Sequence, residues 1–82
     1  MAAADKLVMM ANQIGRFFTA QRGTDPAAAI AEHLGKFWEP RMRAAIVAHL
    51  AAGGAGLDGP VRDAVSRLRD KNADSGQRVT QA

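Results

Sequence analysis

The chain contains no cysteine, no tyrosine and only one tryptophan, and these absences limit the chemistry that it can support. Without cysteine it has no disulfide framework, no thiolate metal site and no thiol nucleophile, a composition compatible with a reducing cytoplasm. No apolar run approaches the length of a membrane span, and the first residues lack the basic leader of a signal peptide. We therefore expect a soluble protein, and 82 residues allow one small domain.

The chain is rich in alanine. The hydrophobic share of 48% includes eighteen alanines, which favour helix but contribute little burial each. Between Leu7 and Leu68 there are nineteen larger apolar residues, enough for a small helical core. The charges are interleaved and sum to +3, so the chain is only mildly basic.

Apolar residues recur at helical spacing in four segments, and each of the three prolines begins one of them. The first helix is predicted at 5–21 with Asp5 as its cap, and the second begins at Pro26 after the capping residue Asp25. The third is predicted between Pro40 and Gly53-Gly54, and the fourth begins at Pro60. The residues predicted to face inward are Leu7, Met10, Ile14, Phe17 and Phe18, then Ile30, Leu34 and Phe37, then Met42, Ile46 and Leu50, and finally Val61, Val65 and Leu68.

These patterns predict an all-α fold, a small bundle of about four short helices. Asp63 and Arg67 are four residues apart on the fourth helix and should form a surface ion pair. We expect a single helical domain at 1–70. The polar, aperiodic residues 71–82 are predicted to form a disordered C-terminal tail.

No motif for catalysis or cofactor binding has the context that it needs. GAGLDG at 54–59 has the letters of a dinucleotide-binding loop, but it follows a helix and no βαβ unit surrounds it. His33 and His49 lie on different helices without ligand-type spacing, and the sequence pairs neither with a nucleophile. We therefore predict no catalytic, cofactor-binding or metal-binding residue on this chain.

A helix-turn-helix module that binds nucleic acid is an alternative for a small, basic, helical chain. The third helix, however, runs AAIVAHLAA after Arg43 and presents no row of side chains that could read bases. The arginines and lysine between 62 and 71 are interspersed with aspartates, which is more typical of a solvated helix face. The sequence favours other partners over nucleic acid.

Docking to another protein agrees better with the apolar pattern. Val8, Met9, Phe17 and Phe18 widen the apolar stripe of the first helix, because neighbouring positions are about 100° apart and cannot all face one core. Some of this surface should stay exposed. The alternative is that a four-helix bundle covers both faces of its first helix internally.

The segment HLGKFWEPRMR at 33–43 is predicted to form a helix–proline–helix corner. Arg41 and Arg43 would lie in the first turn of the third helix, where the macrodipole disfavours a cation by about 0.3–1 kcal/mol. Their presence beside Trp38, expected to be an exposed aromatic residue, suggests that their acceptors belong to another chain.

Three segments together resemble the delta subunit of the NAD-dependent, molybdenum-containing formate dehydrogenases. They are KLVMMANQIGRFF at 6–18, HLGKFWEPRMR at 33–43 and LAAGGAGLDGPVRDAVSRL at 50–68, so that the resemblance covers about 6–69. The residues matched by position are Met10, Ala11, Asn12, Gln13, Ile14 and Gly15, followed by Phe37, Trp38, Glu39, Pro40, Arg41, Met42 and Arg43.

The resemblance implies a non-catalytic accessory subunit of a soluble cytoplasmic complex. It would bind the catalytic alpha subunit and support assembly, stability or insertion of the molybdenum cofactor. No cofactor is expected on this chain, whereas the larger subunits would carry bis-molybdopterin guanine dinucleotide, iron–sulfur clusters, FMN and the NAD site. Membrane and nucleic-acid partners are not expected, but a homo-oligomer is possible.

The first helix and the corner at 37–43 are therefore predicted to dock on the alpha subunit. The predicted interface residues are Met9, Asn12, Gln13, Arg16, Phe17, Phe37, Trp38, Glu39, Arg41 and Arg43. Replacing Trp38 and Arg41 by alanine is expected to weaken this docking while the chain stays helical. A nucleic-acid-binding module and a self-contained homo-oligomeric helical domain remain the alternatives.

Overall fold

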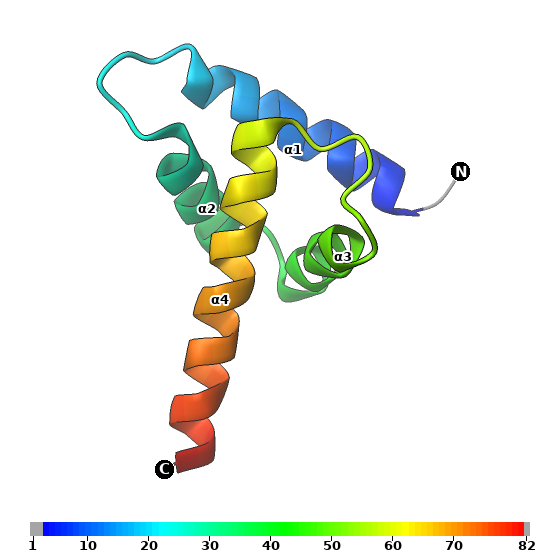
Figure 1. Cartoon of the computed structure of the whole chain (residues 1–82), viewed down its shortest axis with the longest axis vertical. Coiled ribbons are helices and arrows are strands. Elements are labelled where there is room, and N and C mark those ends of the chain that lie inside the picture. Colours follow the sequence, from blue (N-terminus) through cyan, green and yellow to red (C-terminus); the bar gives the residue numbers. More distant parts are fainter. Residues whose placement is uncertain (1–2, 82) are drawn as a thin grey trace.

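Four α-helices make up most of the chain (Figure 1). In this computed structural model the backbone is described for residues 3–81 and the side chains for residues 4–71. The helices are α1 (Ala3–Thr19), α2 (Pro26–Phe37), α3 (Pro40–Ala51) and α4 (Gly59–Gln81), and these residues contain no strand. The predicted all-α class with about four helices is confirmed.

The backbone of α4 is helical to Gln81, so the helix extends into the segment 71–82 that was predicted to be an aperiodic tail. The side chains beyond Lys71 lie outside the described residues, and disorder of this segment stays a prediction, as does the single domain at 1–70.

The helix starts follow the chemistry of capping residues and prolines. The carboxylate of Asp25 accepts hydrogen bonds from the backbone N–H groups of Ala27 (3.1 Å) and Ala28 (3.4 Å), as predicted for the cap of α2. Pro40 is the first residue of α3, also as predicted. The expected cap of α1 is wrong, because Asp5 lies inside the first turn. Alanine is the best helix former, and Ala3 and Ala4 continue the helix ahead of Asp5.

The core lies where α4 packs against the other three helices. Figure 1 shows α2 and α3 on either side of α4, with α1 crossing near its first turn, and α4 makes its most extensive contacts with α2. The largest fully buried side chains belong to α2, α3 and α4; they are Ile30, Leu34, Ile46, Val61 and Val65. All five were predicted to face inward.

The close approach of α1 to α4 depends on a glycine of α1. A Cβ at Gly15 would lie 2.5 Å from Cγ2 of Val61, which is too close for two carbon atoms. One turn earlier, Ala11 is fully buried, and the buried stripe of α1 therefore runs along Val8, Ala11 and Gly15. Small side chains at 11 and 15 allow α1 to approach α4 closely.

Two predicted core residues are wrong. The buried stripe of α1 includes Val8 and Ala11, and Phe18 is partly buried against the same core. Phe17 lies about 100° around the helix from Phe18, on the side away from this stripe, and is therefore exposed. Phe37 is exposed because α2 ends there and the extended backbone of Trp38 turns the indole into the core instead.

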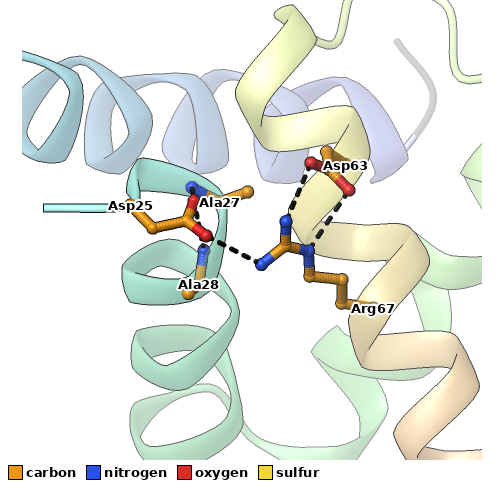
Figure 2. A network of polar contacts seen from close by, with 5 residues as sticks. All are labelled: Asp25, Ala27, Ala28, Asp63 and Arg67. Atoms are coloured by element: carbon orange, nitrogen blue, oxygen red, sulfur yellow. Dashed lines mark hydrogen bonds and ion pairs between the residues drawn. The ribbon is translucent and has the colours of Figure 1, made fainter.

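An ion-pair network joins the beginning of α2 to α4. Arg67 donates two hydrogen bonds to Asp63 (both 3.3 Å), confirming the predicted pair, and a third to Asp25 (3.2 Å). Figure 2 shows the guanidinium between the two carboxylates. The pKa of Asp25 is lowered by the N–H of Ala28 first and then by Arg67, and the pKa of Arg67 is raised by Asp25 and then Asp63. These pairs are solvent-exposed, so their contribution to stability is reduced by solvent screening.

Candidate docking surface

Three large apolar side chains are exposed among the residues with described side chains. The exposed fraction is 59% for Met9, 62% for Phe17 and 71% for Phe37. On α1, Gln13 lies at four-residue spacing between Met9 and Phe17 and is also exposed. The expectation that part of the apolar surface of the first helix stays exposed is confirmed.

Aromatic rings connect the exposed parts of α1 and α2. The ring centroids of Phe17 and Phe18 are 5.2 Å apart, and those of Phe18 and His33 are 5.9 Å apart, both with edge-to-face geometry. His33 and Phe37 follow at 4.8 Å with their planes tilted by 44°. These separations are typical of attractive aromatic pairs. We call Phe17, Phe18, His33 and Phe37, together with Met9 and Gln13, the aromatic surface.

Phe18 was among the residues predicted to widen the apolar stripe of the first helix, but the sequence did not indicate His33 as part of this surface. The four-residue spacing between His33 and Phe37 could have suggested a contact on one helix face. The contact between Phe18 and His33 joins two helices, and no local pattern predicts how α1 and α2 pack. The ring contacts of the aromatic surface can therefore be identified only from the folded structure.

Asn12 has a role within the chain that the sequence did not predict. Its side-chain amide donates to the carbonyl of Gly56 (2.9 Å), and its side-chain carbonyl accepts from the N–H of Asp58 (3.1 Å). Asn12 thus holds the loop between α3 and α4 against α1. Both polar groups of its side chain are therefore used inside the chain, and its predicted contact with a partner stays a prediction.

Trp38 is buried, which corrects the prediction of an exposed aromatic residue. Only 5% of its surface is accessible, and it belongs to the same apolar cluster as Leu34 and Ile46. The backbone N–H of Trp38 donates to the carbonyl of Leu34 (3.1 Å) and closes α2. The indole is therefore a core residue of the corner between α2 and α3.

Arg43 also has its acceptors within the chain. Its Nη1 donates to the backbone carbonyls of Trp38 and, at 3.4 Å, of Gly35. Both carbonyls lie at the C-terminal end of α2, where the macrodipole favours a cation. The prediction that the acceptors of Arg43 belong to another chain is therefore wrong for these two bonds.

The remaining predicted interface residues are at the surface. Gln13, Arg16, Glu39 and Arg41 are exposed, as are Met9, Phe17 and Phe37. Glu39 precedes the first residue of α3 but makes no side-chain capping bond. Whether these residues contact a partner stays a prediction. Four of the predicted interface residues, Met9, Gln13, Phe17 and Phe37, belong to the aromatic surface. In contrast, Asn12, Trp38 and Arg43 make contacts within the chain that stabilise the fold.

The GAGLDG loop also serves the fold. Arg62 of α4 donates to the carbonyls of Gly53 and Gly54, both at 3.0 Å, and a ring nitrogen of His49 lies 2.8 Å from the carbonyl of Ala55. Gly54 has φ +67°, and a Cβ there would lie 3.0 Å from the guanidinium of Arg62. Leu57 packs into the core. The loop is thus a tightly held connection between α3 and α4.

Among the side chains described, no three His, Asp or Glu residues come close enough to hold a metal ion. Over the residues whose structure is described, none of the helices has both the length and the apolar character to cross a membrane. The exposed aromatic surface is therefore the part of the described structure on which we base a functional hypothesis.

Comparison with known proteins gives one match. The model of the family described as NADH-dependent formate dehydrogenase delta subunit, FdsD, matches residues 6–65, which is most of the 82-residue chain. Searches of curated proteins and of solved structures find no match. The matched range includes the aromatic surface and the first turns of α4.

Proposed function

The chain belongs to the family of NADH-dependent formate dehydrogenase delta subunits, and from this premise we propose that it binds the catalytic alpha subunit of that enzyme. In this proposal it is a non-catalytic accessory subunit that supports assembly, stability or insertion of the molybdenum cofactor. The bis-molybdopterin guanine dinucleotide, iron–sulfur clusters, FMN and NAD site belong to the larger subunits of a cytoplasmic complex.

The aromatic surface is the observation that carries this proposal. Exposed apolar area costs about 25 cal/mol per Å² relative to burial, so three exposed large side chains are unfavourable for an isolated small domain. Aromatic residues and methionine are enriched in the centres of protein interfaces. Contact with a partner would bury Met9, Phe17 and Phe37 together.

The polar contacts of α4 support a protein partner over nucleic acid. Arg67 is paired with Asp25 and Asp63, Arg62 with loop carbonyls, and Arg69 with Asp70 at 3.3 Å. Arginines engaged in this way are less able to neutralise phosphates. A homo-oligomer formed through the aromatic surface is the other candidate, because a second copy could bury the same side chains.

The test is a double substitution, Phe17→Ala with Phe37→Ala. Both rings are exposed, so the free energy of unfolding should change by less than about 0.5–1 kcal/mol. Recovery of the tagged chain with the alpha subunit should fall by about tenfold or more, because two interface aromatics each contribute more than 1 kcal/mol in typical hot spots. The molybdenum content of the alpha subunit should fall with it. Arg69→Ala, outside the aromatic surface, is the control.

Normal recovery and normal molybdenum loading with the double variant would contradict the proposal. Size-exclusion chromatography of the isolated chain distinguishes the homo-oligomer: a dimer that the double substitution converts to a monomer, without effect on alpha-subunit recovery, would favour that alternative.

Trp38 is no longer suitable for this test. Replacing a buried tryptophan by alanine costs about 3–5 kcal/mol, a large part of the stability of a small domain. Loss of docking after Trp38→Ala would therefore report unfolding. Phe37, the exposed neighbour, takes its place in the experiment.

A further inference from the structure

A second surface lies between α2 and α4, next to the aromatic surface. Small and apolar residues form its floor, and they are Ala28, Ala31, Gly35 and Leu68. Charged side chains form its rim, and they are Glu32, Lys36, Arg43, Arg67 and Lys71. We call these nine residues the basic groove.

The rim of the basic groove carries an excess of positive charge. Arg67 is occupied by Asp25 and Asp63, and Lys36 is paired with Glu32 at 3.0 Å. Leaving Arg67 aside, three cations, Lys36, Arg43 and Lys71, face one carboxylate. A guanidinium has five N–H donors, and the bonds of Arg43 to the end of α2 both come from Nη1. The groove therefore attracts anionic groups.

The floor leaves room for a side chain from outside. A Cβ at Gly35 would meet only Cδ1 of Leu68, at 4.0 Å, which is an ordinary van der Waals contact. Packing within the chain therefore does not require glycine at this position, in contrast to Gly15. With Ala28 and Ala31 beside it, Gly35 leaves a shallow apolar strip that an incoming apolar side chain can cover.

The composition of the groove fits an acidic polypeptide better than a nucleotide. Bases usually stack on aromatic side chains, and the groove residues include no aromatic ring. The two guanidiniums of the groove are already engaged, that of Arg67 by Asp25 and Asp63 and that of Arg43 by carbonyls at the end of α2. An amphipathic segment places apolar side chains in a groove and charged ones on its rim. Glu32 and Lys36 border both this groove and the hollow beside Phe18 and Phe37, so one partner can cover the two surfaces continuously.

We infer that the basic groove binds an acidic segment of another subunit of the formate dehydrogenase complex, with its carboxylates at Lys36, Arg43 and Lys71. This inference rests on the proposed function, because it takes the partner of the aromatic surface as the source of the segment. The aromatic surface supplies apolar contact, and the groove supplies charge complementarity that speeds association.

The assay measures binding of the purified chain to a formate dehydrogenase complex prepared without its delta subunit. Lys71→Glu should slow association by about three- to tenfold at low ionic strength, with a smaller effect at high ionic strength, where charges are screened. Arg69→Glu is the matched control: it makes the same charge change on the same helix, about 200° around the axis from Lys71. It should change the association rate by less than about twofold.

Gly35→Gln tests the floor. A Cβ at this position has room, and the rest of the added side chain would extend into the groove. We therefore expect the thermal stability to be kept while affinity falls by about fivefold or more. Ala48→Gln, on the exposed side of α3, is its control and should bind normally. Circular dichroism of each variant verifies that the helices are retained.

The inference is overturned if Lys71→Glu and Arg69→Glu have equal effects, or if Gly35→Gln binds as the unchanged chain does. If the aromatic variants still weaken binding in that case, the proposed function is supported and only the inference about the basic groove fails. If no variant on either surface affects binding, both fail. Displacement of the chain by inorganic pyrophosphate at constant ionic strength would assign the groove to a phosphate ligand and also overturn the inference.

Discussion

Arg43 lies in the first turn of α3, but its guanidinium binds the C-terminal end of α2. At the first turn of α3 a cation is disfavoured by the helix dipole, yet the side chain reaches back to carbonyls at the C-terminal end of α2. The same corner buries Trp38. Trp38 and Arg43, both predicted to contact a partner, therefore stabilise the turn between two helices, whereas Phe37 stays exposed.

Asp25 is a second residue with a double role. Its carboxylate caps α2 through Ala27 and Ala28 and pairs with Arg67 of α4. Its folded-state pKa is lowered below 3.8, chiefly by the N–H of Ala28 and then by Arg67. A lowered pKa means that the carboxylate stabilises the fold fully above the unfolded-state pKa, and that this contribution is lost as the pH falls through the folded-state pKa.

Asp25→Asn should remove the ion pair with Arg67 while keeping the hydrogen bonds that cap α2. Asparagine retains a capping oxygen but cannot pair ionically with Arg67, so the variant should melt below the unchanged chain at pH 7. The difference should shrink as the pH falls below the ordinary range of an aspartate carboxyl and through the lowered pKa of Asp25, because Asp25 itself becomes protonated. Asp25→Ala, which loses the cap as well, should melt lowest throughout. Thermal melts by circular dichroism across this range would count against the assignment if the Asp-to-Asn difference stayed constant.

The crossing of α1 and α4 depends on the absence of a side chain at Gly15. Val61, the residue that a Cβ at this position would meet, is fully buried, and its branched side chain has no exposed end that could swing away. Gly35 on α2 is the opposite case, because a Cβ there has room. The two glycines both lie inside helices and differ in their surroundings.

Gly15→Ala should destabilise the chain by about 1–3 kcal/mol through overpacking, despite the higher helix propensity of alanine. Gly35→Ala should stabilise it by about 0.5–1 kcal/mol, because only the propensity changes. Urea unfolding of both variants measures the two effects. A Gly15→Ala chain as stable as the unchanged one would show that the helices are not in close contact at this crossing.

The helices of this fold could be predicted from the sequence because their signals are local. Prolines at 26, 40 and 60, the cap at Asp25 and the stripe of Val61, Val65 and Leu68 act within one helix or its ends. The docking surface could be predicted only in part. Exposure of Met9 followed from the width of the stripe, but burial of Trp38 and the ring contacts of His33 depend on how helices pack, which no local spacing encodes.

The molecule has two adjoining surfaces of different chemistry, one aromatic and one basic. The Glu32–Lys36 pair lies between the aromatic surface and the basic groove, and the Lys36 hydrogen bond is the chief cause of the lowered pKa of Glu32. Core packing among four helices holds both surfaces in place. The proposed subunit role requires that these exposed side chains are held in fixed positions, and it requires no active site on this chain.

The most direct test is photo-crosslinking from position 37 in the assembled formate dehydrogenase complex. Phe37 is exposed, so a benzophenone-bearing phenylalanine can replace it without disturbing the core, and the same group at the exposed position 48 of α3 serves as the control. We predict that position 37 cross-links to the catalytic alpha subunit and that position 48 does not. An assembled complex in which position 37 gives no cross-link to the alpha subunit, or no more than position 48, would contradict the account.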